Sequence, residues 1–173
     1  VFFTLKSSYE LPEIFFQHCQ LEYIPTHKHL GLHVAIDLKL ANHITFIVNK
    51  GHKKLGLLKK LKFSLGKNTL SKMYTVFIRP LLEYAAVVWD GCSQSEMERL
   101  EKVQLCAAHI VTGLPIIASK KSLYFETGWQ PLSDRRKLSK LTIMHKIHNS
   151  CVPKYLSEII LNTRGNDSAS AYR

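Results

Sequence analysis

Long apolar runs are missing from this sequence. The longest, Ala85 to Trp89, falls far short of the roughly 20 residues that a bilayer crossing needs, so we expect no membrane span and no membrane partner. Cysteines are few, and no two of them form a Cys-x-x-Cys pair, which predicts reduced thiols that are buried as small apolar side chains. This cysteine usage is typical of an intracellular protein, in the nucleus or the cytoplasm. The four residues are Cys19, Cys92, Cys106 and Cys151.

Catalytic motifs are also missing. A polymerase-type centre holds two metal ions with paired carboxylates, and none of the four aspartates, Asp37, Asp90, Asp134 and Asp167, has such a partner. No Gly-x-Ser-x-Gly nucleophile motif and no Gly-rich phosphate loop occurs. We therefore expect no catalytic residue, no metal site and no cofactor in this chain.

Two histidine groups invite a metal interpretation, but neither has the paired spacing of a zinc site. We interpret His27, His29 and His33 as the polar face of an exposed strand, with nucleic-acid contact as the functional alternative. His145 and His148, near Cys151, are expected close to a helix C-terminus, where a cation suits the helix dipole.

Acidic residues are absent from one long segment. From Leu38 to Leu82 the sequence has ten Lys or Arg residues and no Asp or Glu, whereas Glu83 to Glu101 is net acidic. The net charge is +11. A basic excess gathered in one segment indicates a phosphate-bearing partner. The acids Glu96, Glu98 and Glu101 lie beside Arg99 and Lys102, and this mixture predicts a solvated helix face with salt bridges.

The patterns that are present predict an α+β fold that is predominantly α-helical, with a short N-terminal β-hairpin and then about five or six helices. Residues 21–34 alternate, so that Leu30, Leu32 and Val34 share the buried side of a strand, and we expect residues 1–5 to belong to the same small β-element. After Asp37 apolar residues recur at helical spacing. The aromatic residues Tyr74, Phe77, Tyr84 and Trp89 are expected in the core.

Helix boundaries follow from capping residues. Gly66 predicts the end of the first long helix, Asn68 or Thr69 the start of the second, and Pro80 a kink or restart. Later signals are a capping box at residues 93–96, a helix end near Gly113, a short helix over residues 119–125, a cap at Ser133 and a helix start at Pro153.

The lysines of the first helix are the main functional signal. At about 100° per residue, Lys50, Lys53 and Lys60 fall opposite the apolar stripe, while Lys54 and Lys59 lie at its margins. Mobile cations along one face neutralise phosphates without reading base sequence, although an ordinary solvated face is the alternative. The candidate nucleic-acid-binding residues are Lys50, Lys53, Lys54, Lys59, Lys60, Lys67 and Lys72.

Several short segments, in order and over most of the chain, resemble the region after the polymerase active site in jockey-like non-LTR retrotransposon reverse transcriptases. They are His29-Leu30-Gly31, Leu38-Lys39-Leu40-Ala41-Asn42-His43-Ile44, Ile78-Arg79-Pro80-Leu81-Leu82-Glu83-Tyr84, Leu100-Glu101-Lys102-Val103-Gln104, Ile110-Val111-Thr112-Gly113, Arg135-Arg136-Lys137-Leu138 and Pro153-Lys154-Tyr155-Leu156. The family usually has Trp at the place of Leu40 and Arg at the place of His109.

The resemblance implies a division of the chain into a palm tail and primer-grip-like hairpin (1–36) and a helical thumb or connection domain (37–161). The polar and small residues at 162–173 predict a disordered tail. Residues Lys28, His29, Leu30 and Gly31 would form the primer-grip-like tip. The Tyr-x-Asp-Asp catalytic turn of the family would lie before Val1, in a parent enzyme that uses Mg²⁺. The chain starts without Met or a leader pattern, and we expect it to be a fragment.

The implied function is to hold an RNA/DNA primer-template duplex for the missing palm and fingers of the parent polymerase, an RNA-directed DNA polymerase. Three alternatives stay open from sequence. The chain could be a stand-alone basic helical domain that binds nucleic acid, a protein-interaction domain, or an inactive remnant of the element.

Overall fold

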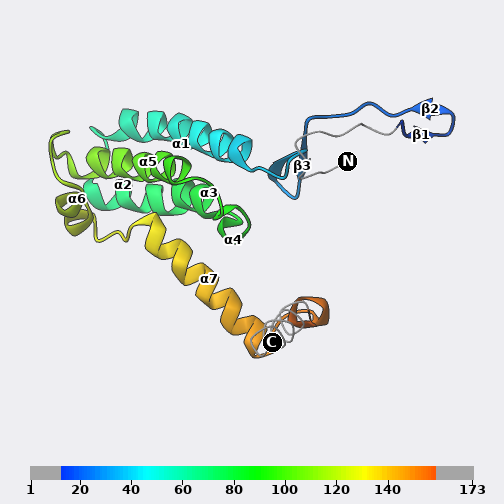
Figure 1. Ribbon diagram of the computed structural model, residues 1–173. Coiled ribbons are helices and arrows are strands. Elements are labelled where there is room, and N and C mark those ends of the chain that lie inside the picture. Colours follow the sequence, from blue (N-terminus) through cyan, green and yellow to red (C-terminus); the bar gives the residue numbers. More distant parts are fainter. Residues whose placement is uncertain (1–12, 159–173) are drawn as a thin grey trace. The chain divides into compact units, whose positions relative to one another are not determined.

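The computed structural model describes residues 13–158 of the chain, and these are mostly helical, with two short β-hairpins at their N-terminal end (Figure 1). The predicted α+β class with predominant helix is confirmed. The chain divides into two compact units, Val1–Ser133 and Asp134–Arg173, which are described separately below. The predicted strand in residues 1–5 and the predicted tail at 162–173 lie outside the described residues.

Two antiparallel hairpins begin the described chain. Strand β1 (Phe15–Phe16) pairs with β2 (Cys19–Gln20), and β3 (Thr26–His29) pairs with β4 (Leu32–Ala35). Between β3 and β4, Leu30 and Gly31 have φ values of 45° and 85°. Two successive positive φ values are those of a type I′ turn, the two-residue connection whose twist fits a hairpin.

The Leu30–Gly31 turn corrects two predictions, because it reverses the chain where the sequence suggests one continuous strand. His27 pairs with Val34 and His29 with Leu32, whereas Lys28 pairs with His33. Paired residues share a face, so His33 lies on the face opposite to His27 and His29. Leu30 is at the turn, with 78% of its surface exposed, and not on a buried strand face.

Helix α1 (Ala41–Leu61) buries the stripe predicted for it, from Ile44 to Leu58. It ends before Lys62, whose N–H bonds back to the Lys59 carbonyl in a tighter turn. The prediction that Gly66 caps this helix is wrong, because Gly66 is extended and is the N-cap of the next one. Asn68 and Thr69, the predicted caps, therefore lie inside that next helix.

Helix α2 (Lys67–Met73) continues through a π-helical turn, η1 (Tyr74–Ile78), into α3 (Arg79–Glu83). Pro80 lies in the first turn of α3, as the predicted restart requires. The buried residues recur at intervals of four: Leu70, Tyr74, Ile78 and Leu82. A π turn holds more residues than an α turn and keeps this interval on one face.

The π turn explains why the prediction of Phe77 in the core is wrong. Phe77 falls outside the buried interval and is 57% exposed. Tyr84, also predicted in the core, is exposed and ends α3. Tyr74 and Trp89 are fully buried as predicted, and Trp89 ends the short helix α4 (Ala86–Trp89).

Helix α5 (Gln94–Thr112) has the predicted capping box, in which Ser93 and Glu96 satisfy each other's backbone N–H, and it ends at Gly113 in the left-handed conformation. Helix α6 (Lys120–Thr127) begins at the N-cap Ser119. The predicted salt-bridged face on α5 is wrong. Glu96 closes the capping box, and Glu101 accepts hydrogen bonds from the Tyr124 hydroxyl and from the backbone N–H of Leu132.

The core of the first unit lies where α1 and α5 pack side by side (Figure 1). Helices α2 and α3 and the π turn η1 pack against α1, and α2 also packs against α5. Gly51 lets the two long helices approach, since an added Cβ would lie only 2.9 Å from Cγ1 of Val103. The four thiols are free, as predicted, but Cys19, Cys106 and Cys151 are exposed and Cys92 is only partly buried. The expectation of buried cysteines is therefore wrong.

Helix α7 (Leu132–His148) supplies most of the described residues of the second unit. It begins at Leu132, so Ser133 lies in its first turn and not at the predicted cap position. His145 and His148 occupy its last turn, as expected. A further helical turn over residues 154–158 follows Pro153. Across residues 13–158, no helix combines the length and apolar character that a membrane crossing needs.

Candidate nucleic-acid interface

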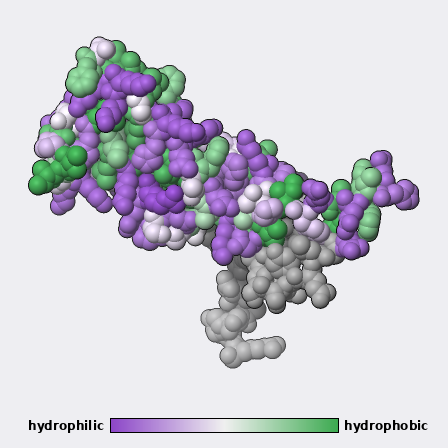
Figure 2. Space-filling view, turned by 90° about the horizontal axis from the view of Figure 1, so that it is seen from above, coloured by the Kyte–Doolittle hydropathy of each residue, from purple (hydrophilic) through white to green (hydrophobic). Residues whose placement is uncertain are grey.

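The exposed side of α1 carries the predicted lysines. The lysines that the helical wheel places opposite or beside the core stripe are all exposed: Lys50, Lys53, Lys54, Lys59 and Lys60. We call these five residues the lysine face. Figure 2, which looks down from above the view of Figure 1, shows hydrophilic side chains over most of this side, with apolar side chains among them. The helix therefore presents its cations away from its core.

Not every predicted lysine is equally mobile. The ammonium group of Lys54 donates a hydrogen bond to the Phe77 carbonyl, at 2.7 Å, and so ties α1 to the π turn. Lys50 Nζ lies 4.9 Å from the ring centroid of Phe46, within cation–π range. Lys53, Lys59 and Lys60 make no such contact with the residues that the structure describes, so we treat them as the mobile lysines of the face.

The two predicted lysines on α2 differ from each other. Lys67 forms an ion pair with Glu126 of α6, so an acid from outside the acid-free segment offsets its charge. Lys72 is exposed in the last turn of α2. Of these two lysines, we therefore expect Lys72 to be the better phosphate contact.

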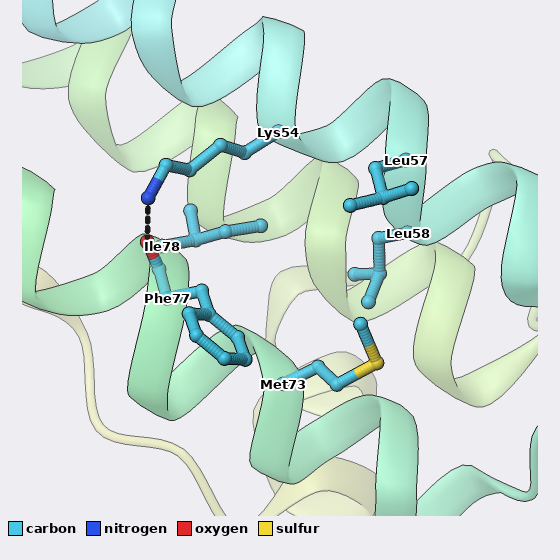
Figure 3. Close-up of a pocket in the computed structure, with 6 residues that line it drawn as sticks. All are labelled: Lys54, Leu57, Leu58, Met73, Phe77 and Ile78. Atoms are coloured by element: carbon cyan, nitrogen blue, oxygen red, sulfur yellow. Dashed lines mark hydrogen bonds between the residues drawn. The ribbon is translucent and has the colours of Figure 1, made fainter.

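An apolar groove runs beside the lysine face, between α1 and the segment formed by α2 and η1. Its volume is about 340 Å³. Figure 3 shows the Phe77 ring and the Met73 side chain extending from one wall, with the α1 side chains forming the other. The lining residues are Lys54, Leu57, Leu58, Met73, Phe77 and Ile78.

Of the groove residues only Lys54 is among the sequence-predicted site residues, and two of the other five, Leu57 and Phe77, are exposed. Leu57 is 56% exposed and, at about 100° per residue, falls among the lysines and not in the core stripe. That misplaced leucine is a signal available from sequence. The exposure of Phe77 could not be predicted in this way, because it depends on the π turn, and the sequence pattern does not predict that turn.

The four residues of the primer-grip-like prediction lie together at the hairpin tip. Lys28 and His29 end β3, and Leu30 and Gly31 form the turn. Tyr84 holds this tip, because its hydroxyl donates a 2.7 Å hydrogen bond to the Leu30 carbonyl. The Tyr84 ring also lies so close to Gly31 that an added Cβ would be 3.2 Å from it.

Replacing Tyr84 with Phe should loosen the hairpin tip without unfolding the helices. The variant keeps the ring but loses one hydrogen bond, worth about 1 kcal/mol, so we expect amide hydrogen exchange in residues 26–35 to accelerate by about fivefold to tenfold. Exchange in α5 should stay unchanged. Tyr155→Phe, which removes a hydroxyl from an exposed residue, is the matched control. Equal exchange in the hairpins of the wild type and Tyr84→Phe would contradict the anchoring role.

A histidine contact holds strand β4 of this hairpin against α1. The His33 ring lies 4.5 Å from the Phe46 ring, centroid to centroid, and the backbone N–H of His33 donates a long hydrogen bond, 3.5 Å, to Nδ1 of the buried His43. Burial, together with the nearby His33, lowers the pKa of His43. The neutral imidazole that accepts this hydrogen bond is thus favoured.

The residues that the structure describes do not fit the Mg²⁺ of a polymerase centre. Within residues 13–158, no group of three His, Cys, Asp or Glu side chains is placed to hold a metal ion. Asp37, which follows the hairpin, pairs with Lys39 at 2.9 Å, and this contact lowers the pKa of the carboxyl group.

Comparison with known proteins gave no match, whether against family models, curated proteins or solved structures.

Proposed function

We propose that this chain binds nucleic acid without sequence preference, as the gripping part of an RNA-directed DNA polymerase. Its parent would be a jockey-like non-LTR retrotransposon reverse transcriptase, and the ligand a primer-template duplex. The chain holds the substrate, and a palm domain elsewhere in the parent protein performs the chemistry with Mg²⁺.

The observation that carries this proposal is the lysine face. Its five cations are exposed on one helix, inside a segment that contains no acid from Leu38 to Leu82. Solvated protein surfaces usually mix both signs of charge. A face with one sign only attracts polyanions and releases their counterions on contact.

The mechanism is electrostatic positioning. Lys53, Lys59 and Lys60 contact backbone phosphates, which fixes the duplex on α1 but leaves the base sequence unread. The hairpin tip, Lys28 to Gly31, reaches the primer end. Tyr84 holds that tip to the helical body, so that the primer end and the duplex are presented with a fixed spacing. Such preorganisation is what a polymerase needs from its non-catalytic parts.

A salt titration tests the proposal. Fluorescence anisotropy with a labelled duplex should give a log-affinity against log-salt slope of about −3 to −5, from about 0.9 per neutralised phosphate. The triple variant Lys53→Gln, Lys59→Gln and Lys60→Gln should flatten that slope by about 2 to 3. It should also weaken binding at low salt by at least tenfold.

A second triple variant is the control, because it removes the same charge from elsewhere in the first unit. Lys102, Lys120 and Lys121 are exposed on α5 and α6, and changing these three to Gln should alter the slope by less than half as much. Equal losses in both variants would mean that net charge alone drives binding. The absence of binding at low salt would overturn the proposal.

A further inference from the structure

The apolar groove and the lysine face are parts of one surface. Both groove walls come from the acid-free segment, since α1 supplies Leu57 and Leu58 while η1 supplies Phe77 and Ile78. Lys54 crosses between the walls and bonds to the Phe77 carbonyl. Lys53 lies one helical turn before Leu57, on the same side of α1. An occupant of the groove must therefore tolerate or prefer a positive surrounding.

We propose that this groove receives an unpaired base of a single-stranded segment, which stacks on Phe77 while neighbouring phosphates contact the lysine face. This inference rests on the proposed function and specifies its ligand: a strand with at least one unstacked nucleotide, such as a template overhang. A fully paired duplex keeps its bases inside the helix and leaves the groove empty.

The chemistry of the groove matches this occupant. A nucleobase has an apolar face that gains from stacking on an aromatic ring, and every base has such a face, so the contact needs no sequence preference. The Phe77 ring is more than half exposed and extends from its wall (Figure 3), so a ligand can reach it. Leu57 and Met73 provide apolar surface for the edges of the base.

The charge pattern favours a nucleic acid over an apolar ligand. Most of the groove lining is apolar. Among the described residues that line it, Lys54 is the only charged one, and Lys50 and Lys53 lie nearby on α1. A single strand carries one phosphate per base, so stacking in the groove brings anions next to these cations. Proteins that bind single strands combine a basic track with stacking aromatic residues in this way.

The test compares three probes by fluorescence anisotropy: an oligothymidylate, a strand of the same length with abasic sites, and a blunt duplex. Wild type should bind the oligothymidylate about tenfold more tightly than the abasic strand. Phe77→Leu keeps apolar volume but removes the aromatic face, so it should lose that tenfold preference and bind the abasic strand and the duplex as wild type does. Phe77→Tyr should restore the preference, and thermal unfolding checks that each variant is folded.

The outcomes separate this inference from the proposed function. Equal affinity of wild type for the thymidylate and abasic strands, with both weakened in the triple lysine variant, overturns the base site and leaves the phosphate grip intact. No binding of any probe overturns both. If an acidic amphipathic peptide binds in a manner that depends on Phe77, while thymidylate shows no preference over the abasic strand, the groove is a peptide site and the base site is wrong.

Discussion

Replacing Trp89 with Ala should destabilise the protein by about 3–5 kcal/mol, the cost of removing a large aromatic side chain from a core. Trp89 is 0% exposed and belongs to the main apolar cluster. Its indole N–H donates a 2.7 Å hydrogen bond to the Tyr84 carbonyl. Folded domains are stable by about 5–15 kcal/mol, so the loss should be visible as a lower urea midpoint at an unchanged m-value.

Two further variants separate the loss of core packing from the loss of the indole hydrogen bond. Val88→Ala shortens an exposed neighbour in the same helix and should cost less than about 0.5 kcal/mol. Trp89→Phe keeps an aromatic ring but removes the N–H donor, so it should fall between the two and also accelerate hydrogen exchange in the hairpin, because Tyr84 anchors the hairpin tip. A cost of Trp89→Ala below about 1 kcal/mol would show that this site collapses around the lost ring or is not in the core.

Replacing Gln104 with Leu should cost about 2–4 kcal/mol, although Leu is apolar and similar in size, because it leaves buried polar groups without partners. The Gln104 amide accepts a 2.6 Å hydrogen bond from the Tyr74 hydroxyl and donates one of 2.9 Å to the Gln130 carbonyl. Burial raises the pKa of Tyr74, so the hydroxyl stays neutral and still needs an acceptor. The measurement is again urea unfolding.

A double variant distinguishes lost hydrogen bonds from poor packing. Tyr74→Phe removes the hydroxyl that Gln104→Leu leaves unsatisfied, so the two changes together should cost less than the sum of the single variants. The Tyr74 ring, which stacks at 4.0 Å on Trp129, is kept in the double variant. Strictly additive costs would show that this hydrogen bond contributes nothing beyond the packing of its two side chains.

Local signals explain most of what the sequence predicts correctly. The capping box at Ser93 and Glu96 and the left-handed Gly113 define α5 through contacts a few residues apart. The core stripe of α1, with lysines on the other side, follows from helical spacing alone. These features depend on near neighbours, so they can be read without knowledge of the tertiary structure.

The features that sequence misses depend on distant contacts. Leu30 adopts a positive φ, which is unusual for a leucine, where Tyr84 bonds to its carbonyl from 54 residues away. Gly66 starts α2 because the chain leaves α1 early at Leu61. The groove exists because a π turn moves Phe77 out of the core. Hence the lysines of the candidate site are predictable, and its aromatic contact is not.

The acid-free segment gives dissolved salt two opposing effects on this chain. Like charges confined to one folded surface repel one another, so ions that screen them favour the native state. The same ions compete with the lysines for a polyanion and weaken its capture. High salt should therefore stabilise the native state during storage but weaken its affinity for nucleic acid. Dilution into low salt restores that affinity and removes the screening that stabilised the fold.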